Sequence, residues 1–337
     1  MSRNRVGENP EKSIDEGAPK EGSGLSFSET VATAIASLAS ETRLRILLVL
    51  WDAQDRPLRF GELRKRVGVA DPGQFRYHLR KLEDQFVRNT AEGYDITNAG
   101  VNVVWAVRSG DLTWSGDVDP FPIDSVCPAC SAGLSLRYEE QMFFVICPDC
   151  GRTHEMAPFH PSGLVGRTNR EIHAAFERVS HGQFELGAHD ICPRCYGTGS
   201  FTLVTDENAV PTDLREELSA AELADLTRYD LQEGIASVVW TCSQCGLWME
   251  FPLAVLLCHR TAVAEFYRDH GVDVDAVPAR DLPNHLGDVA ITVTELDPLS
   301  MLVTMTKDDE TLTVSIDGGF AGVATERTPA DYGSPAS

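Results

Sequence analysis

Apolar residues recur at helical spacing from Phe27 onward, after a start that holds only scattered apolar positions. The spacing predicts helices over 27–38, 40–51, 61–67, 72–85 and 98–108. Between the last two helices, residues 86–97 form the pattern of two short strands around the turn Ala91-Glu92-Gly93. Residues 25–115 are therefore expected to fold as one small unit of helices with a β-hairpin near its end.

The helix that begins at Pro72 has the clearest start signal. Asp71 stands at the N-cap, Pro72 takes the first helical position, where its missing N–H costs nothing, and Gln74 is placed to complete a capping box. Phe75, Leu79 and Leu82 share one face, with His78 beside them as an expected core residue. The polar residues on the opposite face are Gln74, Arg76, Tyr77, Arg80 and Lys81.

The rest of the chain contains a duplicated unit, seen at 123–184 and again at 188–269. Each copy opens with a Cys-Pro-x-Cys pair, continues through an apolar strand into a Cys-x-x-Cys-Gly sequence, and ends with a strand, a proline and a helix. The second copy carries an acidic helical insertion at 211–233. Beyond the copies, period-two alternation over 289–296, 301–306 and 311–316 predicts a small antiparallel sheet.

The cysteines of the duplicated unit have the spacing of metal ligands. Eight of the nine cysteines form four C-x-x-C pairs, with 16 residues between the pairs of the first copy and 46 in the second, where the insertion explains the length. Two such knuckles on hairpin turns bring four thiolates into a tetrahedron, which is the zinc-ribbon arrangement. We therefore expect two Zn²⁺ ions per chain, held by Cys127, Cys130, Cys147 and Cys150 and by Cys192, Cys195, Cys242 and Cys245.

Other uses of these cysteines fit the spacing less well. A redox C-x-x-C is normally a single pair at a strand-to-helix turn, and an iron–sulfur cluster held by four cysteines stays a minor alternative. The ninth cysteine, Cys258, stands alone beside His259. We expect these two residues, together with His154, His160 and His189, to be bystanders, because four thiolates already close a structural site.

The net charge adds a boundary to this picture. The chain has 51 Asp and Glu against 29 Lys and Arg, for a formal charge of −22, and only five of the cations are Lys. Residues 25–115 are nearly neutral, with 12 basic and 11 acidic side chains, whereas residues 116–337 carry 13 and 35. A near-neutral unit joined to a strongly acidic one indicates that the first unit meets a negative partner and the second does not.

The same composition bears on the compartment. Strongly hydrated carboxylates with few lysines suit a cytoplasm very high in salt, which points to a halophile; the alternative is simply an acidic protein. No apolar run approaches the roughly 18–20 residues that a membrane helix needs. The beginning of the sequence lacks the apolar segment of a secretory signal. We expect a cytoplasmic protein with no membrane partner.

Short helices, a capped fourth helix and a hairpin are the parts of a winged helix-turn-helix, whose helix after the turn reads base edges in the major groove. The candidate DNA-binding residues are accordingly Gln74, Arg76, Tyr77, Arg80 and Lys81 on that helix and Arg88 on the hairpin. The alternative is a winged helix used for protein contacts, with its cations as a solvated face. We favour double-stranded DNA because the basic residues cluster here while the remainder of the chain is acidic.

Three segments of this unit resemble ArsR-like winged-helix transcription regulators: Ala39-Ser-Glu-Thr-Arg-Leu-Arg-Ile-Leu47, Phe75-Arg-Tyr-His-Leu-Arg-Lys-Leu82 and Gly93-Tyr-Asp-Ile-Thr-Asn-Ala-Gly100. The acidic chain with two ribbons resembles haloarchaeal regulators of that type. The resemblance covers 27–110 and implies a homodimer with the first and last helices at its interface. Metal sensing by cysteines within the DNA-binding domain does not carry over, because residues 1–126 contain no cysteine.

The sequence therefore predicts an α+β protein whose N-terminal winged helix-turn-helix is followed by two zinc-ribbon/helix repeats and a small antiparallel β-sheet. The expected order is a disordered tail (1–24), the winged helix (25–115), a linker (116–125), repeat 1 (126–186), repeat 2 (187–278), a β segment (279–318) and a tail (319–337). The predicted function is sequence-specific transcription regulation, with no enzymatic activity. A zinc-ribbon adaptor that docks a transcription complex through its winged helix is the alternative, and a zinc enzyme is disfavoured because no open three-ligand site is visible. The sequence names neither an operator nor a small-molecule effector.

Overall fold

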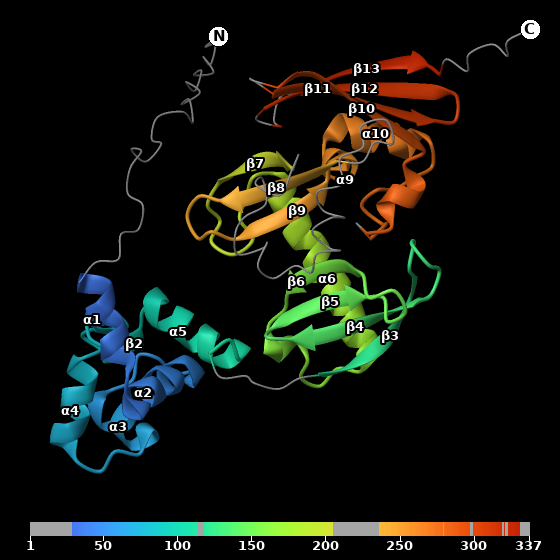
Figure 1. Ribbon diagram of the computed structural model, residues 1–337. Coiled ribbons are helices and arrows are strands. Elements are labelled where there is room, and N and C mark those ends of the chain that lie inside the picture. Colours follow the sequence, from blue (N-terminus) through green and yellow to red (C-terminus); the bar gives the residue numbers. More distant parts are fainter. Residues whose placement is uncertain are drawn as a thin grey trace, which may run out of the picture.

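Figure 1 presents the computed structural model of the protein, which describes residues 29–112, 118–204, 236–278, 280–296, 299–318, 320 and 323–330. Over these ranges the protein is a mixed α+β structure with several antiparallel sheets. The tail expected at 1–24 and the helical insertion expected at 211–233 lie outside the described residues. Within the described ranges, no helix is long and apolar enough to cross a membrane.

The N-terminal block contains helices and a hairpin in the expected order. Its elements are α1 (Glu29–Leu38), α2 (Glu41–Asp52), α3 (Phe60–Val67), α4 (Pro72–Arg80), β1 (Val87–Asn89), β2 (Tyr94–Ile96) and α5 (Asn98–Ser109). The apolar faces of these elements meet in a core of their own, built around Leu50, Leu63, Phe75 and Leu79. The helical periodicity of the sequence therefore corresponds to a real buried surface.

Helix α4 starts as expected but ends earlier. The Asp71 carboxylate accepts the backbone N–H of Gln74, so the N-cap is formed. The helix stops at Arg80 rather than near 85, because the chain turns through Asp84, whose φ is 72°. This turn still brings Leu82 and Phe86 into the core, which is why their spacing resembled a continued helix.

A second block contains the first pair of cysteine motifs on a four-stranded antiparallel sheet in the order β3-β4-β5-β6. Its strands are β3 (Val118–Val126), β4 (Gly133–Glu139), β5 (Met142–Ile146) and β6 (Thr153–Pro158), followed by the short η1 (Pro161–Gly163). The expected linker at 116–125 was wrong, because β3 occupies most of it. Pro120 and Pro122 suggested a linker, but an edge strand accepts prolines, and Phe121 between them is buried.

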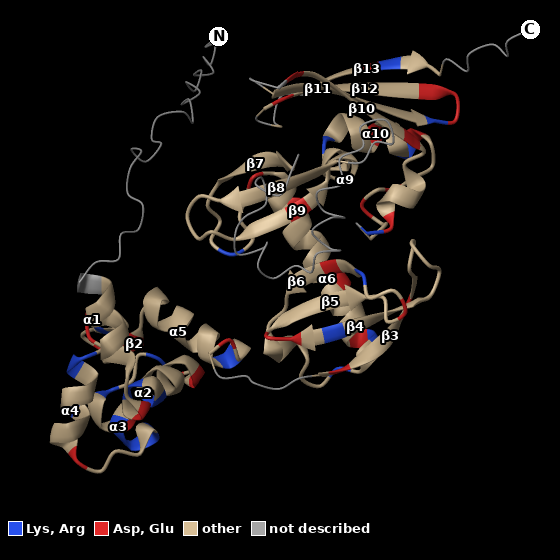
Figure 2. Cartoon of the chain, viewed as in Figure 1, with Lys and Arg blue, Asp and Glu red and all other residues tan. Residues whose placement is uncertain are grey.

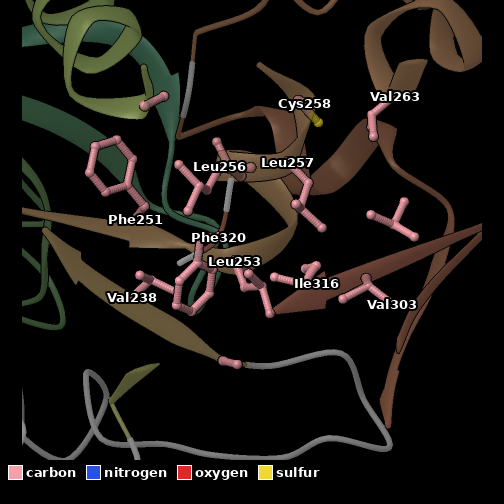
Figure 3. Packing of buried hydrophobic residues seen from close by; sticks show 14 of the residues in the cluster. Val238, Phe251, Leu253, Leu256, Leu257, Cys258, Val263, Val303, Ile316 and Phe320 are labelled. Atoms are coloured by element: carbon pink, nitrogen blue, oxygen red, sulfur yellow. The ribbon is translucent and has the colours of Figure 1, made fainter. Parts of the chain in front are cut away.

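The third block joins the second repeat to the C-terminal sheet. Its elements are β7 (Gly199–Val204), β8 (Ser237–Cys242), β9 (Trp248–Pro252), α9 (Leu253–Cys258), α10 (Thr261–Asp269), η3 (Leu282–His285), β10 (Asp288–Leu296), β11 (Leu299–Lys307) and β12 (Glu310–Asp317). Figure 3 shows Phe251 of β9 and Leu257 of α9 in one cluster with Val303 and Ile316 of the C-terminal sheet. The β segment expected at 279–318 thus shares its core with repeat 2.

The C-terminal sheet has one strand more than expected. Strand β13 (Val323–Pro329) pairs with β12 along its whole length, so the expected tail at 319–337 was wrong for this stretch. Its described side chains, residues 324–329, are all exposed. An edge strand of this kind is held by backbone hydrogen bonds and leaves no hydrophobic alternation in the sequence.

The long helix α6 (Asn169–Ala188) connects the second and third blocks. It opens with a complete capping box between Thr168 and Glu171. Its first half contributes Ile172 and Phe176 to the core of the second block, and its last residue, Ala188, lies in the core of the third. The two cysteine-bearing units are therefore coupled through one rigid helix (Figure 1).

Arg280, a residue of the third block, also connects it to the second block. It follows α10, yet its guanidinium contacts Glu155 of β6 at 2.9 Å and Glu177 of α6 at 2.5 Å. Only 6% of the Arg280 side chain is exposed. Burial by itself lowers the pKa of Arg280, but the two carboxylates raise it above its ordinary value, so the guanidinium is charged and paired.

A smaller contact joins the N-terminal block to the second block. The α5 helix ends at Gly110 in the left-handed conformation, and Asp111 follows it. The Gln141 side chain donates to the Asp111 carbonyl at 3.0 Å, and His160 Nδ1 lies 2.7 Å from its carboxylate. The last helix of the N-terminal block therefore ends on the turn of the β4–β5 hairpin.

We expect Arg280→Ala to lower the free energy of local unfolding in β6 and α6 by about 1–3 kcal/mol, because it leaves two half-buried carboxylates without their cation. Amide hydrogen exchange of these elements measures the loss. The control is Arg327→Ala, which removes an ion pair with Asp269 and a stacking contact with Phe266 in the third block and should leave exchange in β6 and α6 unchanged. Equal effects of the two substitutions would contradict a stabilising role for the ion pairs of Arg280.

Candidate metal centres and a candidate nucleic-acid interface

All four C-x-x-C motifs adopt one backbone conformation. In each motif the N–H of the first cysteine donates to the carbonyl five residues later, at 2.7–2.8 Å, and its own carbonyl accepts the N–H four residues later, at 2.8–3.1 Å. The residue after the second cysteine has a positive φ, as expected for Gly151 and also found at Gly246, Ser131 and Tyr196. The turn is tight enough to require this conformation even where the residue is a tyrosine.

The motifs meet in two tetra-cysteine groups, Cys127, Cys130, Cys147 and Cys150 and Cys192, Cys195, Cys242 and Cys245. The sulfur atoms of each group lie within 4.8 Å of one another, and the closest distances across the motifs are 3.5–3.7 Å. Disulfides have sulfur–sulfur distances near 2.05 Å, so these contacts are not disulfides. A tetrahedron with metal–sulfur bonds of about 2.3 Å has sulfur–sulfur edges of about 3.8 Å. Both groups are therefore positioned to hold one metal ion each.

The electrostatics of the groups fit a cation at their centre. Backbone N–H groups of Cys150 and Asp149 lower the pKa of Cys147 to about 7. Burial raises the pKa of Cys242, but the backbone N–H groups of Cys245 and Gln244 lower it to about 7 overall. These amides stabilise a thiolate, but four thiolates at such short distances repel one another. Full ionisation of each group therefore needs a bound cation.

The additional cysteine and histidines divide into one neighbour and several bystanders. His154 Nε2 lies 3.3 Å from Cys127 Sγ, so this histidine adjoins the first centre although it is not one of the four grouped ligands. His160 contacts Asp111, and His189 contacts the Glu185 carbonyl. Cys258 is buried at the end of α9, where its thiol donates to the Ala254 carbonyl. Its isolation from both groups agrees with a packing role.

The candidate DNA-binding residues of α4, and Lys81 at its C-cap, are all exposed. Phe75, Leu79 and Leu82 are buried beneath it, while the exposed residues are Gln74, Arg76, Tyr77, Arg80 and Lys81. None of the three cations forms an ion pair with a carboxylate in the described part of the chain. Figure 2 shows Lys and Arg gathered around α2 to α4. This face is therefore free to meet an anionic partner.

Two further contacts distinguish the candidate cations from one another. The guanidinium of Arg76 stacks on the ring of Phe60, at 5.0 Å from its centroid, so its orientation is supported from below. Arg88 of the hairpin is instead ion-paired with Asp95 on the neighbouring strand. Arg59, at the N-cap of α3 and next to Phe60 in the chain, is a further exposed cation that was not among the predicted DNA-binding residues.

The apolar surface expected on the outer helices is only partly exposed. Ile35 of α1 and Trp105 of α5 are 60% and 57% exposed, and Val31 is 42% exposed. Val104, the neighbour of Trp105 on α5, is buried in the core. Trp105 packs edge-on against Trp51, at 6.3 Å between ring centroids. Exposed apolar side chains are therefore present on both α1 and α5.

Comparison with known proteins finds two matching families. The family described as Domain of unknown function (DUF7351) matches residues 124–321, and the family described as Domain of unknown function (DUF7347) matches residues 31–107. The first match covers both cysteine groups and most of the C-terminal sheet, and the second covers the N-terminal block. No curated protein and no solved structure matches the chain.

We expect the purified protein to bind two metal ions per chain, and Cys147→Ser or Cys242→Ser to reduce this to about one. Each substitution removes a thiolate that the other three cannot replace, and metal binding supplies folding free energy to its block. Elemental analysis after gel filtration measures the content, with Cys258→Ser as the control that keeps both ions. Acidification should release the metal, because protons compete for the thiolates. A content unchanged by either cluster substitution would contradict the assignment.

Proposed function

The chain belongs to the family described as Domain of unknown function (DUF7351), and we propose that it is a sequence-specific DNA-binding transcription regulator with two structural zinc centres. The observation that carries the proposal is the exposed polar face of α4, whose cations have no carboxylate partner among the described residues. The order of α2, α3, α4 and the β1–β2 hairpin supports a winged helix-turn-helix, in which α4 enters the major groove.

The residue types on α4 suit base reading. Gln74 can pair with adenine, Arg76 with the O6 and N7 atoms of guanine, and Tyr77 can contact a phosphate or a thymine methyl group. Arg80 and Lys81, near the end of the helix, are placed for phosphates. Arg76 is the strongest candidate for a base contact, because Phe60 supports its guanidinium and so reduces the entropy lost on binding.

Charge restricts where DNA can bind. The segment 116–337 has 35 acidic against 13 basic side chains, so phosphates are repelled from it. In a cytoplasm of very high salt, little affinity comes from counterion release, since that gain falls steeply with salt concentration. Discrimination then depends on base-edge contacts, each of which contributes roughly 1–3 kcal/mol.

Zinc is the metal that the centres suit best. Closed sites of four cysteine thiolates at tetrahedral spacing are typical of structural zinc, and both groups have buried and exposed cysteines in the same alternation. Bound zinc supplies folding free energy by crosslinking two hairpin turns. Elemental analysis that finds iron in place of zinc would contradict this part of the proposal.

We expect Arg76→Ala, in the full chain at molar KCl, to reduce the preference for the selected site by roughly 5- to 150-fold, which corresponds to losing 1–3 kcal/mol. Arg88→Ala is the matched control, and its effect should be smaller because Asp95 already neutralises Arg88. The site is first identified by genome-wide mapping of bound sequences, and binding is then measured by fluorescence anisotropy. If Arg76→Ala leaves the preference for the selected site unchanged, the DNA surface lies elsewhere in the protein. Binding to proteins alone would favour the adaptor function.

We also propose that the protein is a homodimer, with exposed apolar residues of α1 and α5 at its interface. We expect light scattering in high salt to give the mass of a dimer, and Ile35→Glu to give a monomer, because the charge would be buried against the second copy. Val165→Glu is the control, since Val165 is 68% exposed on the second block, far from α1 in sequence. A monomeric wild-type protein would contradict a two-fold arrangement on a palindromic site.

A further inference from the structure

The two metal centres differ at one position beside the ligands. In the first repeat the fourth residue after the last cysteine is His154, and in the second repeat the same position is Met249. His154 lies on β6 with its Nε2 at 3.3 Å from Cys127 Sγ. Met249 instead lies against Gly187 of α6, as part of the packing between helix and sheet. The duplicated architecture thus carries a nitrogen donor at one centre and a thioether at the other.

The chemistry of the contact determines its direction. A cysteine that binds a metal is a thiolate, which accepts hydrogen bonds and donates none. Nε2 of His154 must therefore carry the hydrogen when the first centre is loaded, and the contact is an N–H donated to a charged sulfur. A divalent ion with four thiolates has a net charge of −2, and a donor to one sulfur offsets part of that charge.

The position of His154 also separates it from the ligands. The four sulfur atoms of the first centre form a mutually close group, and Nε2 is not a member of it. Residues in this outer position orient metal ligands and stabilise their charged form, and removing them typically weakens metal binding by about 10- to 100-fold.

We infer that His154 is an outer-sphere residue of the first centre, where its N–H to the Cys127 thiolate slows metal release. The two centres are consequently inequivalent: the first loses its metal more slowly than the second, which has Met249 at the corresponding position. This inference rests on the proposed zinc loading of both centres.

The test follows zinc release from the full, zinc-loaded chain into 4-(2-pyridylazo)resorcinol, a coloured chelator. We expect two phases, and Cys242→Ser, which removes the second centre, should retain only the slow one. His154→Met, which copies the second repeat, should accelerate the slow phase by about 10- to 100-fold and leave the fast phase unchanged. His154→Gln keeps a side-chain N–H and should accelerate it less.

Cadmium-113 NMR of the cadmium-loaded protein gives a readout that does not depend on release rates. We expect two resonances in the range of four-sulfur coordination, of which His154→Met shifts only one, and a histidine Nε2 with the nitrogen shift of a protonated site. If His154→Met does not fold, the nitrogen shift in the wild type and the His154→Gln release rate decide the question.

Three results would overturn the inference or its basis, and they are distinguishable. If neither His154 variant changes the release phases, the contact does not slow metal release and the inference is wrong. A wild-type resonance typical of three sulfurs and one nitrogen would make His154 a direct ligand. A wild-type protein without zinc would contradict the proposed function itself, because there would then be no phases to compare.

Discussion

Mutual repulsion among closely packed thiolates is the constraint on which the acidic part of the molecule depends. Each group brings four sulfur atoms together on hairpin turns whose backbone conformation is the same in all four motifs. Full ionisation of such a cluster requires a cation at its centre, which would couple metal binding to folding there. The core of the second block is small, and the crosslink between its two turns compensates for the limited apolar area that it can bury.

The blocks are arranged around elements that belong to more than one core. Helix α6 contributes to the sheet before it and to the sheet after it, and Arg280 returns from the third block to pair with carboxylates of the second. A family match that spans 124–321 agrees with this coupling, since neither repeat is separable from its neighbours without exposing apolar surface. The N-terminal block has its own core and meets the others through the end of α5.

Charge is distributed in accordance with this division. The excess of acidic residues lies in the coupled blocks, whereas the exposed face of α4 in the N-terminal block presents cations that have no carboxylate partner among the described residues (Figure 2). A block that has its own core and a different net charge can engage an anionic partner without bringing the acidic part into contact with it. In this arrangement the candidate metal centres are a scaffold beside the proposed DNA surface rather than a part of it.

The sequence by itself determined the elements whose signals are local. Helical periodicity and the Asp71 cap located α4 and its exposed face, and the duplicated C-x-x-C spacing identified all eight grouped cysteines, because knuckle geometry is set within a few residues. Only the tertiary structure decided which edge strands exist, since β3 contains prolines and the described side chains of β13 are all exposed. It also decided which polar groups meet: Arg88 with Asp95, Arg280 with Glu155 and Glu177, and His154 with Cys127. These contacts join residues from different elements, and their formation depends on packing that no local pattern records.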